Sequence, residues 1–290
     1  MSMDRVLPGR SARPTATTLS RGGDVEFLAV PGILARSNEQ LEPLMPTLKR
    51  RNLTVVGFDY GEVFDANESA KTVAQLVRSN MSIDRRTILF GSSLGGRIVA
   101  NALRLLEPEF DEYRLRLMVP VIIVDSPARS QDLVLAPPLS GSINPAVGKM
   151  LRGIKPSEKS NSGYGKRLLK MFMVPPKDHE IELTNGGPTT EQLKQAAVQG
   201  LSGHLVTGWM AQLKWMLSTQ MDLGHLSKLN ATYMACTNGN VTVRQPQAKE
   251  AWRPFVDQVV DVDTPHCAYL QAQASWSNSL NHVLRSFVRV

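Results

Sequence analysis

The chain has 290 residues, of which 42% are hydrophobic, so it is long enough to bury the core of one large domain. Its net charge of +7 comes from Lys and Arg residues spread along the chain, without a basic stripe interleaved with aromatics, and this argues against a nucleic-acid partner. The two cysteines, Cys236 and Cys267, are too few for a disulfide framework and too far apart for a CxxC metal site.

The N-terminal sequence does not predict a secretory leader or a membrane anchor. Residues 1–23 lack the apolar centre of a secretory signal, and no stretch of the chain approaches the apolar length that crosses a bilayer. We therefore expect a cytoplasmic protein without a membrane span. Residues 1–22 are rich in Arg, Ser, Thr, Pro and Gly, which predicts a flexible arm before the fold.

Apolar strands alternate with amphipathic helices through the first half of the chain. The expected strands are residues 25–32, 53–60, 86–91 and 115–127. The expected helices are residues 37–51, residues 67–80 with Asn67 as the N-cap, and residues 94–108. Such alternation predicts a mostly parallel sheet with helices on both faces.

The alternation of predicted strands and helices stops after Pro127. Residues 128–228 show no convincing strand, only helical patterns at residues 165–173, 189–199 and 204–218. Strands return at residues 231–237 and 255–263, and a helix closes the chain at residues 275–288. The sequence therefore predicts a core of residues 23–127 and 229–290 that carries a helical cap over residues 128–228.

The stretch "TILFGSSLGGRIVANAL" contains a candidate nucleophile. Gly91, Ser93 and Gly95 match a GxSxG pattern between an apolar strand and a helix, which is the context that the pattern requires. Glycines two residues before and after the serine remove side chains that would collide with a sharp turn. Such a turn directs the Ser93 hydroxyl to the carboxyl edge of the sheet; the alternative is a glycine-lined turn without catalysis. Ser92 lacks flanking glycines, so we expect it to pack.

A serine nucleophile needs a base. His266 follows the last predicted strand and precedes the final helix, so it lies at the same edge of the sheet as Ser93 and is the best candidate. We expect structural roles for the remaining histidines, which are His179, His204, His225 and His282.

The sequence does not support a phosphate-binding loop or a metal site. The stretch "GYGKR" lacks the first glycine and the preceding strand of a phosphate-binding loop, and no histidines and carboxylates have metal-ligand spacing. We therefore expect neither a metal nor a cofactor.

After the arm, nearly the whole chain resembles the α/β-hydrolase superfamily. The matching stretches are "VPG", "GFDYGE", "GSSLGG", "VIIVDSP", the helical region, "ATYMAC" and the terminal "PHC". The resemblance implies a mostly parallel sheet flanked by helices, with a cap inserted after the strand that follows the nucleophile helix. It also implies a triad in the order nucleophile, acid, histidine, in which Ser93 and His266 take the first and last places.

The acid of the predicted triad does not lie at the position that is usual in this family. The family most often places an Asp after the penultimate strand, where this chain has Asn240. A minority of the family carries the acid one strand earlier, and Asp125 ends the strand "VPVIIVD". We predict Asp125 as the partner of His266, with Asn240 as the alternative and a turn-capping role for Asp125 as the non-catalytic interpretation. Asp263 lies on the strand just before His266 and is a weaker candidate.

The resemblance also implies an oxyanion hole made of two backbone N–H groups. The candidates are Leu94, after the nucleophile, and Ile33, after the first strand. The family commonly has His-Gly before the second donor, whereas this chain has Pro31 and Gly32. Arg36 lies close by and is expected to be solvated, with an anionic substrate group as its alternative partner.

These expectations combine into a serine hydrolase that cleaves a carboxylic ester or thioester of a small-molecule substrate through an acyl-enzyme. The alternative is a hydrolase-like binding protein that kept the fold and lost the triad, which Asn240 and Pro31 would favour. The cap also carries large apolar residues, which we expect to pack on the core or to line an acyl pocket: Trp209, Met210, Trp215 and Met216.

Overall fold

The structure is a computed structural model that describes residues 13–133 and 206–288, apart from residues 34, 62, 239, 241 and 267. Within these residues seven strands form one sheet in the order β1-β3-β2-β4-β5-β6-β7. They are β1 (Thr15–Ser20), β2 (Glu26–Val30), β3 (Thr54–Asp59), β4 (Thr87–Ser92), β5 (Val121–Val124), β6 (Ala231–Cys236) and β7 (Gln258–Val262). Strand β1 runs antiparallel to β3, and the other neighbouring pairs are parallel, which confirms the predicted mostly parallel sheet.

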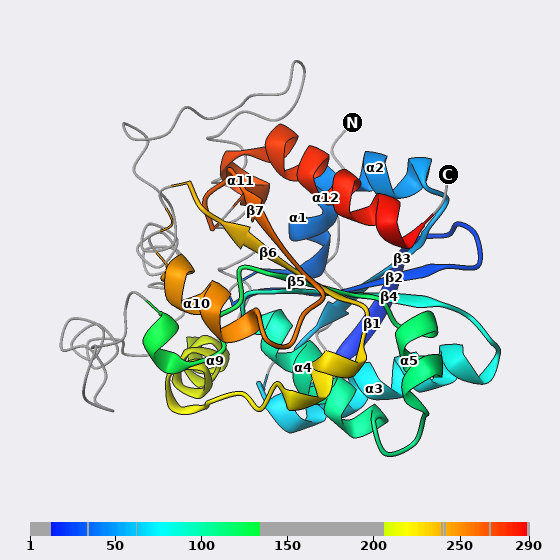
Figure 1. The fold of residues 1–290 in the computed structure, drawn as a ribbon, viewed down its shortest axis with the longest axis horizontal. Helices are drawn as coiled ribbons and strands as arrows, with labels where there is room; N and C mark the ends of the chain where they lie inside the picture. Colours follow the sequence, from blue (N-terminus) through cyan, green and yellow to red (C-terminus); the bar gives the residue numbers. More distant parts are fainter. Residues whose placement is uncertain are drawn as a thin grey trace.

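Helices cover both faces of this sheet (Figure 1). One layer consists of α1 (Ser37–Leu41), the short η1 (Glu42–Leu44), α2 (Met45–Arg50) and α12 (Gln273–Phe287). The opposite layer consists of α3 (Ala66–Ser82), α4 (Leu94–Leu106) and α5 (Glu112–Met118).

The side chains of β2 explain why both faces are covered. Phe27 and Ala29 lie in one apolar cluster with α12, while Leu28 and Val30 lie in a second cluster with α3 and α4. Successive residues of a strand point to opposite faces, so a central strand that is apolar at every position needs a helical layer on each side.

The remaining elements lie near the carboxyl ends of the parallel strands or connect them. They are η2 (Ser130–Asp132), α9 (Val206–Ser218), η5 (Gly224–Lys228), α10 (Gln245–Trp252) and α11 (Ala268–Gln271). Helix α9 confirms the third helical pattern of the predicted cap. The other two patterns, at residues 165–173 and 189–199, lie outside the described residues, as do Cys267, His179 and His204. No helix in the described part of the chain is both long and apolar enough to cross a membrane.

The N-terminal arm differs from the prediction. Thr15–Ser20 forms β1, which pairs with β3 from Thr15 opposite Asp59 to Ser20 opposite Val55. Its residues are exposed or only partly buried, and its sequence lacks the apolar run that identifies a strand. Backbone pairing at the sheet edge accounts for its formation.

Two element boundaries were also wrong. Residues 115–118 belong to helix α5, whose N-cap Asp111 accepts a hydrogen bond from the backbone N–H of Arg114 at 2.8 Å, and only Val121–Val124 is strand. The cap of α3 is Asp65 and not Asn67, because Asp65 Oδ1 accepts the backbone N–H of Asn67 at 2.8 Å.

The segment predicted as one helix over residues 37–51 is divided into α1, η1 and α2, with prolines near the starts of the second and third pieces. A proline lacks the N–H that a continuous helix needs, so the chain bends at each one. Helix α10 was not predicted at all.

Candidate active site

Ser93 lies on the sharp turn between β4 and α4. Its backbone angles, φ 50° and ψ −114°, are in a region that side chains rarely adopt. Its N–H donates to the carbonyl of Val124 at 2.8 Å, and its own carbonyl accepts the N–H of Gly96 at 3.1 Å. The strained turn is therefore held by hydrogen bonds on both sides.

The two glycines of the GxSxG pattern make this turn possible. A Cβ at Gly91 would lie 2.8 Å from the carbonyl oxygen of Gly95. A Cβ at Gly95 would lie 2.7 Å from the carbonyl oxygen of Pro31 and closer still to that of Val30. Only glycine fits at these positions, because Gly91 lies against the first turn of α4 and Gly95 lies against the end of β2.

The Ser93 hydroxyl is buried and unpaired. Ser93 is 2% exposed, and no described residue forms a hydrogen bond with its Oγ. Buried hydroxyls are normally satisfied, so an unpaired one beside a strained backbone needs an explanation. The structure does not bring this oxygen into hydrogen-bond contact with His266.

Asp125 and His266 do meet. Asp125 follows β5, and its Oδ2 lies in hydrogen-bond contact with Nδ1 of His266, across 141 residues of sequence. A carboxylate accepts this hydrogen bond from the tautomer of His266 that carries its proton on Nδ1, and in that tautomer Nε2 is the basic nitrogen. Asp125 is 1% exposed. Asp263, the weaker candidate, is exposed at the end of β7.

Asn240 contacts the acid and not the imidazole. Its Nδ2 donates to Asp125 Oδ2 at 2.7 Å and to the carbonyl of Cys236 at 3.0 Å. Its Oδ1 accepts the backbone N–H groups of Thr242 at 3.0 Å and Val243 at 2.9 Å. Asn240 is therefore a hydrogen-bond donor to Asp125.

A third donor to Asp125 was missed by sequence reasoning. Gln245, the first residue of α10, donates from Nε2 to Asp125 Oδ1. No local pattern marks this glutamine, because its partner lies 120 residues earlier in the chain. The neighbouring proline at the second position of the helix is the one sequence signal that could have located α10.

The loop after β2 lies directly against Ser93. A Cβ at Gly32 would lie 3.3 Å from the Cβ of Ser93 and 4.0 Å from its Oγ. The hydroxyl of buried Tyr60 donates to the carbonyl of Pro31 at 2.6 Å, and burial raises the pKa of Tyr60 well above its usual value, so it stays a donor. This bond fixes the peptide plane between Pro31 and Gly32, one residue before the peptide that carries the Ile33 N–H.

Leu94 directly follows Ser93 in the chain, and Ile33 directly follows Gly32, which lies against Ser93. Leu94 is the first residue of α4, so its N–H has no acceptor within the helix. Ile33 follows Gly32 and packs partly buried against the core. Arg36, three residues further, is half-buried.

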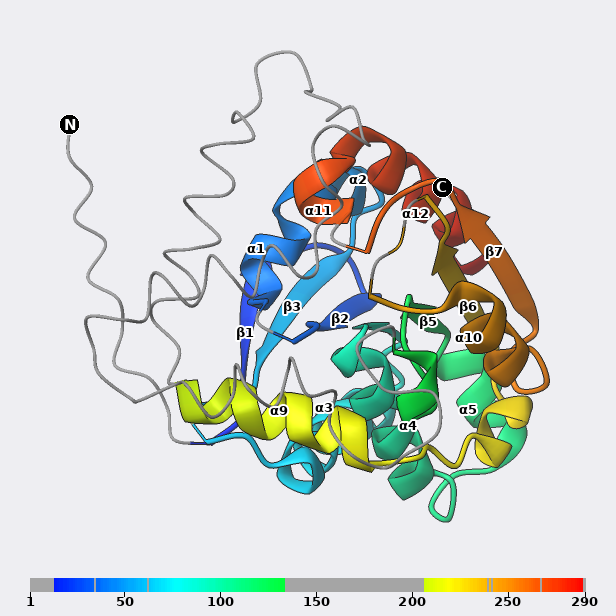
Figure 2. The ribbon, with the colours of Figure 1, turned by 90° about the vertical axis from the view of Figure 1, so that its left-hand side faces the viewer.

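Helix α9 lies in front of α3 and α4 in Figure 2, and its C-terminal half contacts the segment before α3 and the first turn of α4. Trp215 contacts Phe64 at a ring distance of 6.1 Å and lies 5.4 Å from the guanidinium of Arg97 on α4. Arg97 is fully buried and donates to the carbonyls of Met216 at 2.6 Å and Thr219 at 2.5 Å. Trp215 and Met216 thus pack on the core, as predicted for the cap, whereas the side chains of Trp209 and Met210 are outside the described ones.

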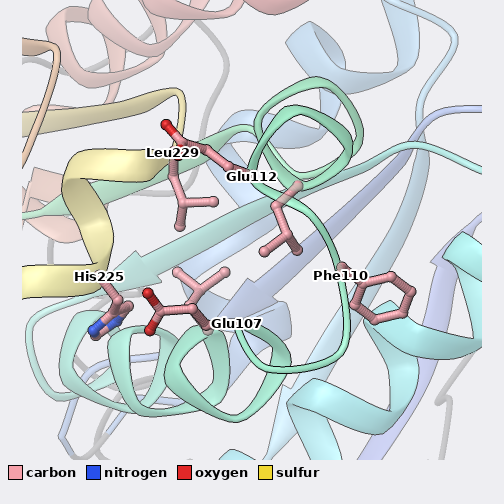
Figure 3. A pocket seen from close by; sticks show the side chains of 7 residues that line it. Glu107, Phe110, Glu112, His225 and Leu229 are labelled. Atoms are coloured by element: carbon pink, nitrogen blue, oxygen red, sulfur yellow. The ribbon is translucent and has the colours of Figure 1, made fainter.

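A separate small cavity lies at the other end of α4 (Figure 3). It has a volume of about 50 Å³, and Leu103, Glu107, Phe110 and His225 are among its lining residues. Nε2 of His225 is 2.8 Å from the carbonyl of Ala100, and burial lowers the pKa of this histidine. This contact fits a structural histidine.

The remaining histidine and cysteine among the described residues are His282 and Cys236. His282 is exposed on α12, and Cys236 is buried at the end of β6. Across residues 13–133 and 206–288, with the gaps named above, no three His, Cys, Asp or Glu side chains are grouped so that they could hold a metal ion.

No model of a known protein family matches the sequence, and no curated protein matches it. Solved structures do match. An esterase from Exiguobacterium antarcticum has a TM-score of 0.61 at 15% identity, covering 96% of this chain and 95% of its own. A bromoperoxidase from Bacillus anthracis has a TM-score of 0.63 at 14% identity, covering 94% of each chain. An esterase from Rhodococcus sp. ECU1013 has a TM-score of 0.62 at 14% identity, also covering 94% of each.

The chain has the α/β-hydrolase fold. The aligned regions span more than nine-tenths of both chains in each of these matches. The α/β-hydrolase fold supports esterases and a bromoperoxidase among these neighbours, so the fold alone does not specify the reaction. The reaction has to be argued from the side chains around Ser93.

Proposed function

We propose that this protein is a serine hydrolase that cleaves a carboxylic ester or thioester through an acyl-enzyme. The observation that carries the proposal is the contact of His266 Nδ1 with Asp125. Asp125 follows β5, which is the direct neighbour of β4, and Ser93 follows β4. A carboxylate that orients an imidazole, at the same edge of the sheet as a serine on a strained turn, is the arrangement used for acyl transfer.

The proposed chemistry starts with attack of Ser93 Oγ on the carbonyl carbon of the substrate. Nε2 of His266 takes the hydroxyl proton, and Asp125 stabilises the imidazolium that forms. The backbone N–H groups of Leu94 and Ile33 hold the negative oxygen of the tetrahedral intermediate. Collapse of the intermediate breaks the bond to the alcohol or thiol, which leaves with the proton from His266. Water then repeats the sequence on the acyl-enzyme and releases the acid.

The buried, unpaired Ser93 hydroxyl is compatible with this chemistry. Hydrogen bonds of catalytic groups are often long in an unliganded enzyme and shorten when substrate binds. A hydroxyl without a partner also loses no hydrogen bond when it turns toward the imidazole.

Two experiments on the full chain test the proposal. A fluorophosphonate probe should label the wild-type protein, and a short-chain p-nitrophenyl ester should give a burst of p-nitrophenol. Ser93→Ala should abolish both, while Ser92→Ala, the matched change at the preceding residue, should retain them.

If the wild-type protein is neither labelled nor active on the activated ester, the hydrolase proposal is wrong. Tight binding of an acyl compound that is unchanged by Ser93→Ala would instead support a hydrolase-like binding protein. The contact between Asn240 and Asp125 weighs against that alternative, because Asn240 has a role other than replacing a lost acid.

A further inference from the structure

The carboxylate of Asp125 accepts three side-chain donors. His266 and Asn240 share Oδ2, and Gln245 occupies Oδ1. We propose that Gln245 and Asn240 are positioning residues, which hold the Asp125 carboxylate in the plane and rotamer that accept the Nδ1–H of His266. This inference rests on the proposed function, because it assigns these residues a part in the same site.

Asn240 has only one orientation that satisfies its neighbours. Its oxygen faces the N–H groups of Thr242 and Val243, so its NH₂ group must face Asp125 and the carbonyl of Cys236. A carboxylate at this position would place a second acceptor 2.7 Å from Asp125 Oδ2. The asparagine at the usual position of the acid is therefore suited to an acid that comes from the neighbouring strand.

Gln245 acts on the other oxygen of the same carboxylate. Its side chain is 7% exposed, and its Oε1 has no hydrogen-bond partner among the described residues. The bond from its Nε2 to Asp125 is thus what orients this buried amide. A carboxylate held at both oxygens cannot rotate about its Cβ–Cγ bond without losing a charge-assisted hydrogen bond.

The backbone of Asp125 is held as firmly as its side chain. Its φ of 46° is strained, and its N–H donates to the carbonyl of Met234 at 2.8 Å. The carbonyl of the next residue, Ser126, accepts hydrogen bonds from Trp252 Nε1 at 2.6 Å and from Tyr233 OH at 3.3 Å. With the backbone fixed, the remaining freedom of the acid is rotation about its two side-chain torsions, χ1 and χ2. Gln245 and Asn240 restrict that rotation.

The first test is Gln245→Met. Methionine keeps the length of the side chain and removes the donor to Asp125 without leaving another described partner unpaired. We expect kcat for a p-nitrophenyl ester to fall about tenfold, with KM unchanged within about twofold, because the group acts on the chemical step. Gln247→Met is the matched control, since Gln247 is exposed on the same helix.

The second test is Asn240→Asp. Aspartate still offers an oxygen to the N–H groups of Thr242 and Val243, so the turn is kept, but it replaces the donor with a second carboxylate oxygen. We expect kcat to fall about tenfold or more, since two adjacent carboxylates repel or share a proton. A residue that served only the turn would tolerate this change.

A readout independent of turnover separates this inference from the proposed function. The proton between His266 Nδ1 and Asp125 should give a far-downfield ¹H NMR resonance in the full-length protein, absent from His266→Gln. We expect this resonance to move or broaden in Gln245→Met and Asn240→Asp and to remain in Gln247→Met.

An unchanged resonance and unchanged kcat in both variants would overturn the positioning role. If the wild-type protein shows no esterase activity, the proposed function fails, and the resonance alone decides whether Gln245 and Asn240 hold the acid.

Discussion

Ser93 and Asp125 follow neighbouring parallel strands, and both have a positive backbone φ, 50° and 46° respectively. The N–H of Ser93 donates to the carbonyl of Val124, the residue before Asp125, so one strained turn is bonded directly to the strand that leads into the other. Each such conformation costs about 1–3 kcal/mol and persists because its surroundings over-determine it.

Ser93→Gly should be more stable than Ser93→Ala. Both variants lack the hydroxyl, but glycine also relieves the backbone strain at this position. Glycine has more conformational freedom in the unfolded chain, which lowers stability, but the relief of strain is larger. We expect the free energy of unfolding of Ser93→Gly to be higher by about 1 kcal/mol. Urea unfolding of the two variants measures the difference. At Ser92, which lies in β4, the alanine variant should be more stable to urea than the glycine variant. An alanine variant at residue 93 as stable as the glycine variant would contradict a strained turn.

Gly95→Ala should destabilise the protein by about 2 kcal/mol or more, because its Cβ would overlap the carbonyl oxygens of Val30 and Pro31. Those are backbone atoms, which cannot move aside as a side chain would. The control is Gly224→Ala, where the nearest atom is an Asp222 oxygen at an ordinary 3.5 Å. Equal thermal midpoints for the two variants would show that the first turn of α4 does not contact the end of β2.

Arg97→Met should lower the free energy of unfolding by about 3 kcal/mol, because the carbonyls of Met216 and Thr219 lose their buried donor and the carbonyl of Ala128 keeps only the backbone N–H of Met221. Burial lowers the pKa of Arg97 to about 10, so the side chain is charged at neutral pH.

Arg104→Met, at an exposed position of the same helix, is the control for Arg97→Met and should change stability by less than about 0.5 kcal/mol. Trypsin cleavage after exposed Lys214 should also become faster in Arg97→Met, since α9 loses its anchor. Cleavage at the wild-type rate would argue against Arg97 as that anchor.

His225 should make the protein less stable in acid. Burial lowers the pKa of His225 below its ordinary value of 6.5, so the unfolded chain binds a proton more readily than the folded protein. The unfolding free energy therefore rises with pH up to about 6.5 and then no longer depends on this group.

Chemical unfolding across this pH range tests the role of His225. His225→Gln keeps an amide donor for the carbonyl of Ala100 and should flatten the acid-side slope relative to wild type. The exposed His282→Gln should leave the slope unchanged. The same slope in wild type and His225→Gln would assign the acid sensitivity to another group.

Elements with a strong local pattern were predictable. The apolar run before Gly91 and the helical spacing after Gly96 define β4 and α4, and steric exclusion at the two pattern glycines requires the turn between them. Where local and tertiary preferences compete, the prediction was wrong. Thr15–Ser20 is polar and becomes a strand only by pairing with β3, and residues 115–118 continue the apolar run of β5 but are capped as a helix by Asp111.

The amino-acid sequence by itself determined the alternation of strands and helices and the position of Ser93, because both follow from periodicity and from steric limits within a few residues. Only the tertiary structure decided between Asp125 and Asn240 as the neighbour of His266, and only it revealed Gln245. Hydrogen bonds between residues 115 to 141 positions apart depend on how strand ends meet at one edge of a sheet, and no local pattern encodes that distance.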